Sequence, residues 1–281
     1  MTQPDAGLAI GMSVCFLRND LETAVAEVAD LGFDAVEIFG GHLGPGLPNV
    51  RPFEAHAAAA AELVRRSGLV VSTLNVVGAE GFDPFGDRDA YDATVALTAD
   101  HLRLAAAMGS PRILVWDGRI ADPRDAADAS ARLAGIFDEA RTRSGLSAPP
   151  AISVELHPFT FALQHRRLND LAAALRGSGA GICLDLCHFG VGLGHAWLDA
   201  VDDEVLAAID HVHYSDTDLE TSELHFPLGL GRLDLDAVDA KLAGRGLAVA
   251  WDLFGWPAPR AAVAHSMARY RQAVAACATR S

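Results

Sequence analysis

The sequence has almost no lysine. Of 22 basic residues among 281, only Lys241 is a lysine, and 37 acidic residues give a formal net charge of −15. Schiff-base aldolases, pyridoxal enzymes and lysine-dependent phosphate loops each need a lysine in the site, and Lys241 lies in an expected surface helix. The acidic excess also disfavours a nucleic-acid partner, because its phosphates would need clustered cationic side chains.

Long apolar runs are absent as well. No run reaches the ~18 residues needed to cross a bilayer. The N-terminal residues 1–20 lack the basic start and apolar core of a signal peptide. We therefore expect a soluble cytoplasmic protein without a membrane partner. The four cysteines are too few and too irregularly spaced for a disulfide framework, so we expect reduced, mostly buried thiols.

What the sequence does contain is a regular alternation of short apolar runs and longer alanine-rich amphipathic segments. Strands are predicted over residues 8–12, 35–39, 69–75, 112–117, 151–156, 181–186, 211–216 and 247–254. Helices are predicted over residues 20–32, 53–68, 90–109, 124–145, 168–179, 198–210, 235–246 and 259–278, several beginning at Asp or Asn and ending at Gly.

Eight such units of about 35 residues each predict an α/β fold, a (β/α)8 barrel formed by one domain over residues 1–281. A doubly wound open sheet is the alternative architecture. The sequence has no GxGxxG fingerprint after the first predicted strand, which weakens the dinucleotide-binding form of that alternative.

Polar residues that could carry chemistry close the last four predicted strands. The active site of a parallel barrel lies at the carboxyl ends of its strands, and side chains alternate between the two faces of a strand. This alternation points acidic and histidine side chains from four neighbouring strands toward one axial point: Glu155, Asp185, one of His211 and His213, and Asp252.

Three carboxylates placed together would repel one another strongly unless protons or a cation offset their charge. A single divalent metal ion is the simplest solution. One imidazole with three carboxylates suits Mn²⁺, our first choice, or Mg²⁺, Co²⁺ or Zn²⁺, rather than a soft thiolate site.

The motifs around these residues resemble a known family. ELHP at 155–158, DLCH at 185–188, HVHYSD at 211–216, GLGRLD at 229–234 and GFDAVEIFG at 32–40 are similar to motifs of the xylose-isomerase-like TIM-barrel superfamily. This sugar phosphate isomerase/epimerase group also includes ketose 3-epimerases, inosose isomerases and dehydratases, 3-dehydroshikimate dehydratases and endonuclease IV. The resemblance implies four metal ligands, which are Glu155, Asp185, His213 and Asp252.

The resemblance also implies roles beside the metal. His157 corresponds to the proton-transfer histidine of the dehydratase branch, His188 to a contact with a substrate hydroxyl or carbonyl, and Glu37 to an acidic pocket residue. Glu155 and Asp252 are counted as catalytic residues as well as ligands. Further candidates to line the substrate pocket close other strands or follow them, and these are Asn75, Trp116, His225 and Trp256.

The sequence departs from individual branches of the family. Asp252 stands where ketose epimerases carry a longer glutamate that also acts as acid and base. Phe161 and Leu219 replace a glutamate and an arginine of those enzymes, and Ser215 replaces a lysine of the dehydroshikimate dehydratases. Endonuclease IV needs a larger set of histidine and carboxylate ligands for three zinc ions, and we find no such set in this sequence.

The leading prediction is a metal-dependent isomerase or epimerase of a sugar, ketose or cyclitol, which removes a proton next to a carbonyl and passes through an enediolate. One alternative is a metal-dependent dehydratase or lyase on a related keto-polyol, similar to 3-dehydroshikimate or inosose dehydratases. Another is a non-catalytic sugar-binding subunit. The expected partner is a small polyol, and the family resemblance suggests a homodimer or homotetramer.

Overall fold

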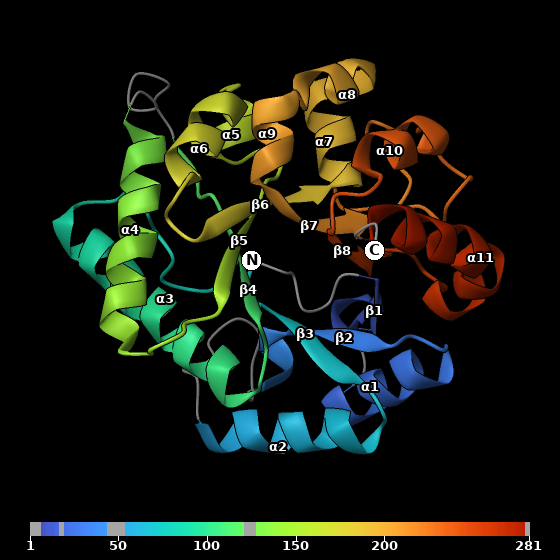
Figure 1. Cartoon of the computed structure of the whole chain (residues 1–281), viewed down its shortest axis with the longest axis horizontal. Helices are drawn as coiled ribbons and strands as arrows, with labels where there is room; N and C mark the ends of the chain where they lie inside the picture. The colour runs from blue at the N-terminus through green and yellow to red at the C-terminus, as the bar shows by residue number, and fades with distance from the viewer. Residues whose placement is uncertain (1–6, 17–19, 44–53, 121–127, 279–281) are drawn as a thin grey trace.

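Eight parallel strands form a closed barrel in chain order, from β1 to β8 and back to β1 (Figure 1). This computed structural model describes residues 7–16, 20–43, 54–120 and 128–278. All eight predicted strands are confirmed, with shifts of at most a few residues at their ends. They are β1 Ala9–Met12, β2 Ala35–Phe39, β3 Val70–Asn75, β4 Arg112–Trp116, β5 Ala151–Glu155, β6 Ala180–Asp185, β7 Ile209–Tyr214 and β8 Ala248–Trp251. The chain is thus a single-domain TIM barrel.

Helices surround the barrel, and most of them lie where the sequence predicts (Figure 1). The side chains of Asp20, Asp87 and Asp234 accept hydrogen bonds from the first turns of their helices, and Gly145 ends another at a φ of 70°. The start of the helix predicted at residue 124 lies outside the described residues. The confirmed helices are α1 Leu21–Asp30, α2 Glu54–Arg66, α3 Arg88–Ala107, α4 Ala129–Ser144, α6 Leu168–Leu175, α10 Leu235–Leu242 and α11 Pro259–Cys277.

The helix predicted over residues 198–210 is instead two short helices, α8 Trp197–Ala200 and α9 Asp203–Ala208. The break has a local cause. The side chain of Asp202 accepts hydrogen bonds from the backbone N–H groups of Glu204 and Val205, so that it caps a new helix. The last residues of the predicted segment belong to β7.

Some short elements were not predicted. Among them, α7 Leu186–Leu193 begins directly after β6, so His188 lies in its first turn and not in a loop. The helix follows the strand without a connecting turn. The mainly apolar sequence LDLCHFGVG therefore gives no signal for where β6 ends and α7 begins. The other elements are α5 Phe161–Gln164 and the 3-10 turns η1 Ser13–Phe16, η2 Gly40–Leu43 and η4 Gly194–Ala196.

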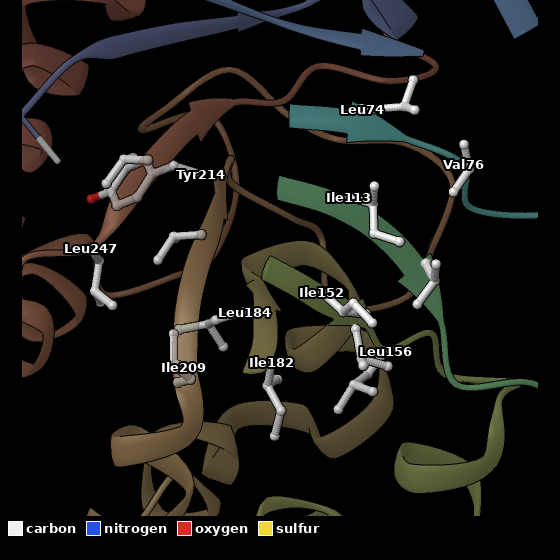
Figure 2. Close-up of a cluster of buried hydrophobic side chains, with 14 of the residues drawn as sticks. Leu74, Val76, Ile113, Ile152, Leu156, Ile182, Leu184, Ile209, Tyr214 and Leu247 are labelled. Atoms are coloured by element: carbon white, nitrogen blue, oxygen red, sulfur yellow. The ribbon is translucent and has the colours of Figure 1, made fainter. Parts of the chain in front are cut away.

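The main core fills the space between the strands and the surrounding helices. Leu74, Ile113, Ile152 and Ile182 belong to this layer and come from four successive strands (Figure 2). Their neighbours along each strand point into the barrel, as expected from the alternation of side chains. The core therefore fixes which strand residues face the barrel axis.

Inside the barrel, a separate apolar cluster occupies the side formed by β1, β2 and β8. It consists of Ile10, Met12, Ala35, Ala248 and Ala250. Buried polar side chains predominate in the interior of β5, β6 and β7, and Glu37 of β2 reaches them beside His211 and His213. The interior is thus divided into an apolar and a polar side, which determines the shape of the candidate site.

All four cysteines are free thiols, as expected. No helix in the described part of the chain is long and apolar enough to cross a membrane.

Candidate metal centre

The four predicted ligand residues come together at the carboxyl ends of the last four strands. The Nδ1 atom of His213 lies 2.9 Å from Oε1 of Glu155 and 3.6 Å from an oxygen of each of Asp185 and Asp252. All four side chains are at most 6% exposed. Glu155, Asp185 and His213 offer buried ligand atoms close enough together to hold one divalent cation, and Asp252 approaches the same imidazole nitrogen.

Glu37 orients the imidazole of His213 from beneath. Its carboxylate lies 3.2 Å from Nε2 of His213 and 2.8 Å from Nε2 of His211, and it accepts a hydrogen bond of 2.8 Å from Nδ2 of Asn75. Burial alone would raise the pKa of Glu37, but the two histidines lower it to about 2. The ionised Glu37 therefore holds Nε2 and leaves Nδ1 of His213 directed at the other carboxylates.

Helix α7 orients Asp185. Oδ1 of Asp185 accepts a hydrogen bond of 3.0 Å from the backbone N–H of His188, which caps the helix. The buried Oδ2 accepts no hydrogen bond from the described residues, although Nδ1 of His188 lies 3.2 Å away and Nδ1 of His213 3.6 Å away. A buried carboxylate oxygen without a hydrogen bond is costly, and a bound cation would satisfy it. Oδ2 therefore fits the role of a ligand atom for a cation at this position.

His157 and His188 stand side by side above the carboxylates, with ring centroids 3.9 Å apart. Burial lowers the pKa of His188 to about 4. Burial acts in the same direction on His157, but Glu155 and Glu223 raise its pKa to about 10. In the metal-free protein at neutral pH, His157 therefore holds a proton while His188 is free to accept one.

The connection between β7 and α10 brings two more side chains to the site. Nδ1 of His225 lies 2.8 Å from Oδ2 of Asp252, and Oε1 of Glu223 lies 3.8 Å from Nδ1 of His157. From the sequence motifs, His225 is predicted only as a substrate contact, and Glu223 is assigned no role. A signal was available, because the tripeptide ELH occurs at 223–225 as well as at 155–157.

Asp216 holds this connection in place. Its two carboxylate oxygens accept four backbone hydrogen bonds of 2.8–3.1 Å. A Cβ atom on Gly231 would lie 2.2 Å from Oδ1 of Asp216, so only glycine fits there. These contacts explain why HVHYSD and GLGRLD occur together. The donors are the N–H groups of Thr217, Gly229, Gly231 and Leu233.

A cavity of about 240 Å³ opens onto this centre. Six residues predicted from the sequence line it, whereas Glu37, Asp185 and His213 are buried outside its lining. Trp116 and Trp256 are also outside the lining. The ring of Trp116 stands edge-on to His157, and that of Trp256 packs against Phe226. The predicted residues that line the cavity are Asn75, Glu155, His157, His188, His225 and Asp252.

Comparison with solved structures places the architecture among proteins of varied activity. One is an IOLI protein with a bound zinc atom (16% identity, TM-score 0.72, 98% of this chain and 100% of the other). Another is a D-tagatose 3-epimerase-like protein (17%, 0.71, 95% and 98%). A third is the probable 3-DHS dehydratase AsbF of Bacillus anthracis (14%, 0.70, 93% and 97%). At these identities the likeness shows the fold alone.

A search of curated proteins finds no match. A family profile does match: the profile described as xylose isomerase-like TIM barrel covers residues 25–274. This chain therefore belongs to the xylose isomerase-like TIM barrel family.

Proposed function

We propose that the protein is a divalent-metal-dependent isomerase or epimerase of a small sugar, ketose or cyclitol. The observation that carries the proposal is the convergence of Glu155, Asp185, His213 and Asp252 beneath a cavity flanked by two histidines. The epimerase-like and zinc-containing solved structures support the same choice.

The four converging side chains are the proposed ligands, and the ion is proposed to be Mn²⁺, with Mg²⁺, Co²⁺ or Zn²⁺ as alternatives. The donor set of hard oxygens and one imidazole fits any of these ions. When bound, such an ion polarises carbonyl and hydroxyl oxygens and stabilises negative charge on them.

The residues of the chain itself would bind the substrate and move its protons. His157, His188 and Asp252 all line the cavity. A base at Nε2 or Nδ1 of one histidine removes the proton next to the carbonyl, and a second group returns it to another carbon or to the other face. Return to another carbon gives isomerisation, and return to the other face gives epimerisation.

The second candidate is a dehydratase or lyase acting on a keto-polyol. The position of His157 favours this candidate. Its imidazole lies in the cavity, with Nε2 3.6 Å from Glu155 and Nδ1 3.8 Å from Glu223. A protonated imidazole there could deliver the proton needed for loss of a β-hydroxyl as water. Formation of an absorbing conjugated enone would distinguish this reaction from isomerisation.

The test is metal content combined with proton exchange. We expect the purified protein to bind one divalent ion per chain and to exchange the hydrogen next to the carbonyl of a keto-polyol for solvent deuterium, followed by NMR. Asp185→Ala removes a ligand and should lower both metal occupancy and exchange, the latter by at least about 100-fold.

Glu62→Gln is the matched control, because it removes a carboxylate from the exposed surface of α2. It should leave both readouts unchanged. A metal-free wild-type protein, or an Asp185→Ala variant with full exchange activity, would contradict the proposal. Tight polyol binding without exchange in the metal-loaded protein would support a non-catalytic sugar-binding role instead.

A further inference from the structure

The cavity above the metal centre has two chemically different walls. The polar wall carries Glu155, His157, His188, Glu223, His225 and Asp252. The apolar wall, as it is called here, is formed by Met12, Val14, Phe39 and Val77, which belong to β1–β3 or follow them and so lie across the closed barrel from β5–β7. Phe254, the remaining apolar residue of the lining, packs against His225 instead. Met12 belongs to the apolar cluster inside the barrel, and Val14 packs against it. The division of the barrel interior thus continues into the cavity.

Asn75, the last residue of β3, is the one polar residue that β1–β3 and the segments after them contribute to the described lining, and its amide is already partly engaged. Its Nδ2 donates to Glu37, and its Oδ1 accepts a hydrogen bond of 3.1 Å from the backbone N–H of Val77. Glu37 in turn faces His211 and His213. Among the described side chains, this side of the cavity can therefore offer a substrate hydroxyl only the remaining amide hydrogen and the second Oδ1 lone pair of Asn75.

A hydroxyl pressed against the apolar wall would lose water without gaining a partner, whereas a methylene or methyl group there is stabilised by burial. The lining also contains three carboxylates and, within the described residues, no arginine or lysine. Arg119 is stacked on Phe159 and Trp116 and is not among the lining residues. The imidazoles of the lining already face carboxylates, His157 toward Glu155 and Glu223 and His225 toward Asp252. Among the described residues, a phosphate or carboxylate on the substrate would therefore meet three carboxylates and no cationic side chain free of an acidic neighbour.

We infer that the substrate is an uncharged, partly deoxygenated keto-polyol. Its carbonyl and neighbouring hydroxyls lie along the polar wall, and a carbon without a hydroxyl lies against the apolar wall. This inference rests on the proposed function, since it assigns the substrate class of the same site. The cavity volume of about 240 Å³ suits a single small ring or a six-carbon chain.

The first test compares matched pairs with the Mn²⁺-loaded protein. scyllo-Inosose is paired with its analogue that lacks the hydroxyl on the ring carbon opposite the carbonyl, and D-fructose with 6-deoxy-D-fructose, while D-fructose 6-phosphate tests charge. We expect kcat/KM for deuterium exchange to favour the deoxy member of at least one pair by roughly tenfold, and the phosphate to be the poorest of the ketoses. Equal or faster exchange of the fully hydroxylated member in both pairs, or a preference for the phosphate, would overturn the inference.

The second test changes the apolar wall itself. Val77→Thr adds one hydroxyl at nearly constant volume and should reduce the preference for the deoxy member by roughly threefold or more. Val70→Thr is the matched control, because Val70 is 51% exposed and lies outside the cavity. An unchanged preference in Val77→Thr would contradict the assignment of this wall.

Calorimetric binding of the same five compounds separates the two proposals. Tighter binding of the deoxy members without exchange would overturn the catalytic proposal and support the substrate class. Exchange at equal rates and equal affinities within both pairs would support catalysis and overturn the substrate class. Neither binding nor exchange with any compound would overturn both.

Discussion

Asp117 is a buried carboxylate, and it connects two elements of the site. It follows β4, and its Oδ2 accepts a hydrogen bond of 2.5 Å from the backbone N–H of Ala162. Thr160 lies two residues before Ala162, and its Oγ1 accepts a hydrogen bond from the backbone N–H of His157. Burial raises the pKa of Asp117 to about 7, although hydrogen bonds from Thr160 and Ala162 oppose the shift. Asp117 thus fixes the chain next to His157 while remaining partly protonated at neutral pH.

This raised pKa predicts a pH-dependent contribution to stability. The folded protein holds the proton up to about pH 7, whereas the unfolded chain releases it near pH 4, so this group destabilises the fold as pH rises from about 4 to 7. Asp117→Asn cannot ionise. Relative to wild type, its free energy of unfolding should therefore increase by a few kcal/mol between about pH 4 and pH 8, measured by urea denaturation. Parallel pH profiles of the two proteins would contradict the prediction.

At the scale of elements, the connection from β7 to α10 carries Glu223 and His225 to the cavity. Residues 216–233 of this connection contain no helix or strand of the barrel, and one bridge pairs Asp216 with Phe226. The positions of Glu223 and His225 depend on the four hydrogen bonds that Asp216 accepts. A connection held by one carboxylate should be sensitive to its loss.

Asp216→Ala should accelerate amide hydrogen exchange over residues 217–233, because four backbone donors lose their acceptor. The barrel strands should remain protected, and catalytic turnover should fall by roughly tenfold as Glu223 and His225 are displaced. Asp218→Ala is the matched control. Asp218 is half-buried, and in the described structure it accepts hydrogen bonds only from the neighbouring Glu220 and Thr221, so the change should stay local. Equal effects of the two substitutions would argue against the role of Asp216.

At the scale of the whole molecule, the C-terminal helix secures the junction where the barrel closes. The hydroxyl of Tyr270 on α11 accepts a hydrogen bond of 3.0 Å from the backbone N–H of Ile10 and contacts the carbonyl oxygens of Ile10 and Val249. It thereby connects the first strand with the last one. This contact joins residues 260 positions apart in the sequence.

Tyr270→Phe leaves the ring in place but removes this connection. Because the buried N–H of Ile10 loses its side-chain acceptor, the free energy of unfolding should fall by about 1–3 kcal/mol in chemical denaturation. Tyr91→Phe removes a hydroxyl that bonds Glu139 near the surface, and its effect should be below about 0.5 kcal/mol. Similar losses in both variants would show that the barrel junction has no special dependence on Tyr270.

The barrel and the position of its chemistry could be predicted from the sequence because both depend on local periodicity. Apolar runs located the eight strands, and alternation along them placed Glu155, Asp185 and Asp252 on the inner face. The family resemblance then separated His213 from His211, which the alternation alone could not do. The acidic residues at the barrel mouth are also part of the charge excess visible in the composition.

Only the tertiary structure shows which further residues orient the predicted ligands and which reach the cavity from other parts of the chain. Glu37 orients His213 from a strand 176 residues away in sequence, and Glu223 and His225 reach the site through a connection held by Asp216. The apolar wall likewise combines residues of the first three strands and of the segments that follow them. Such contacts leave no periodic signal, because closure of the barrel, and not the neighbouring sequence, brings their atoms together.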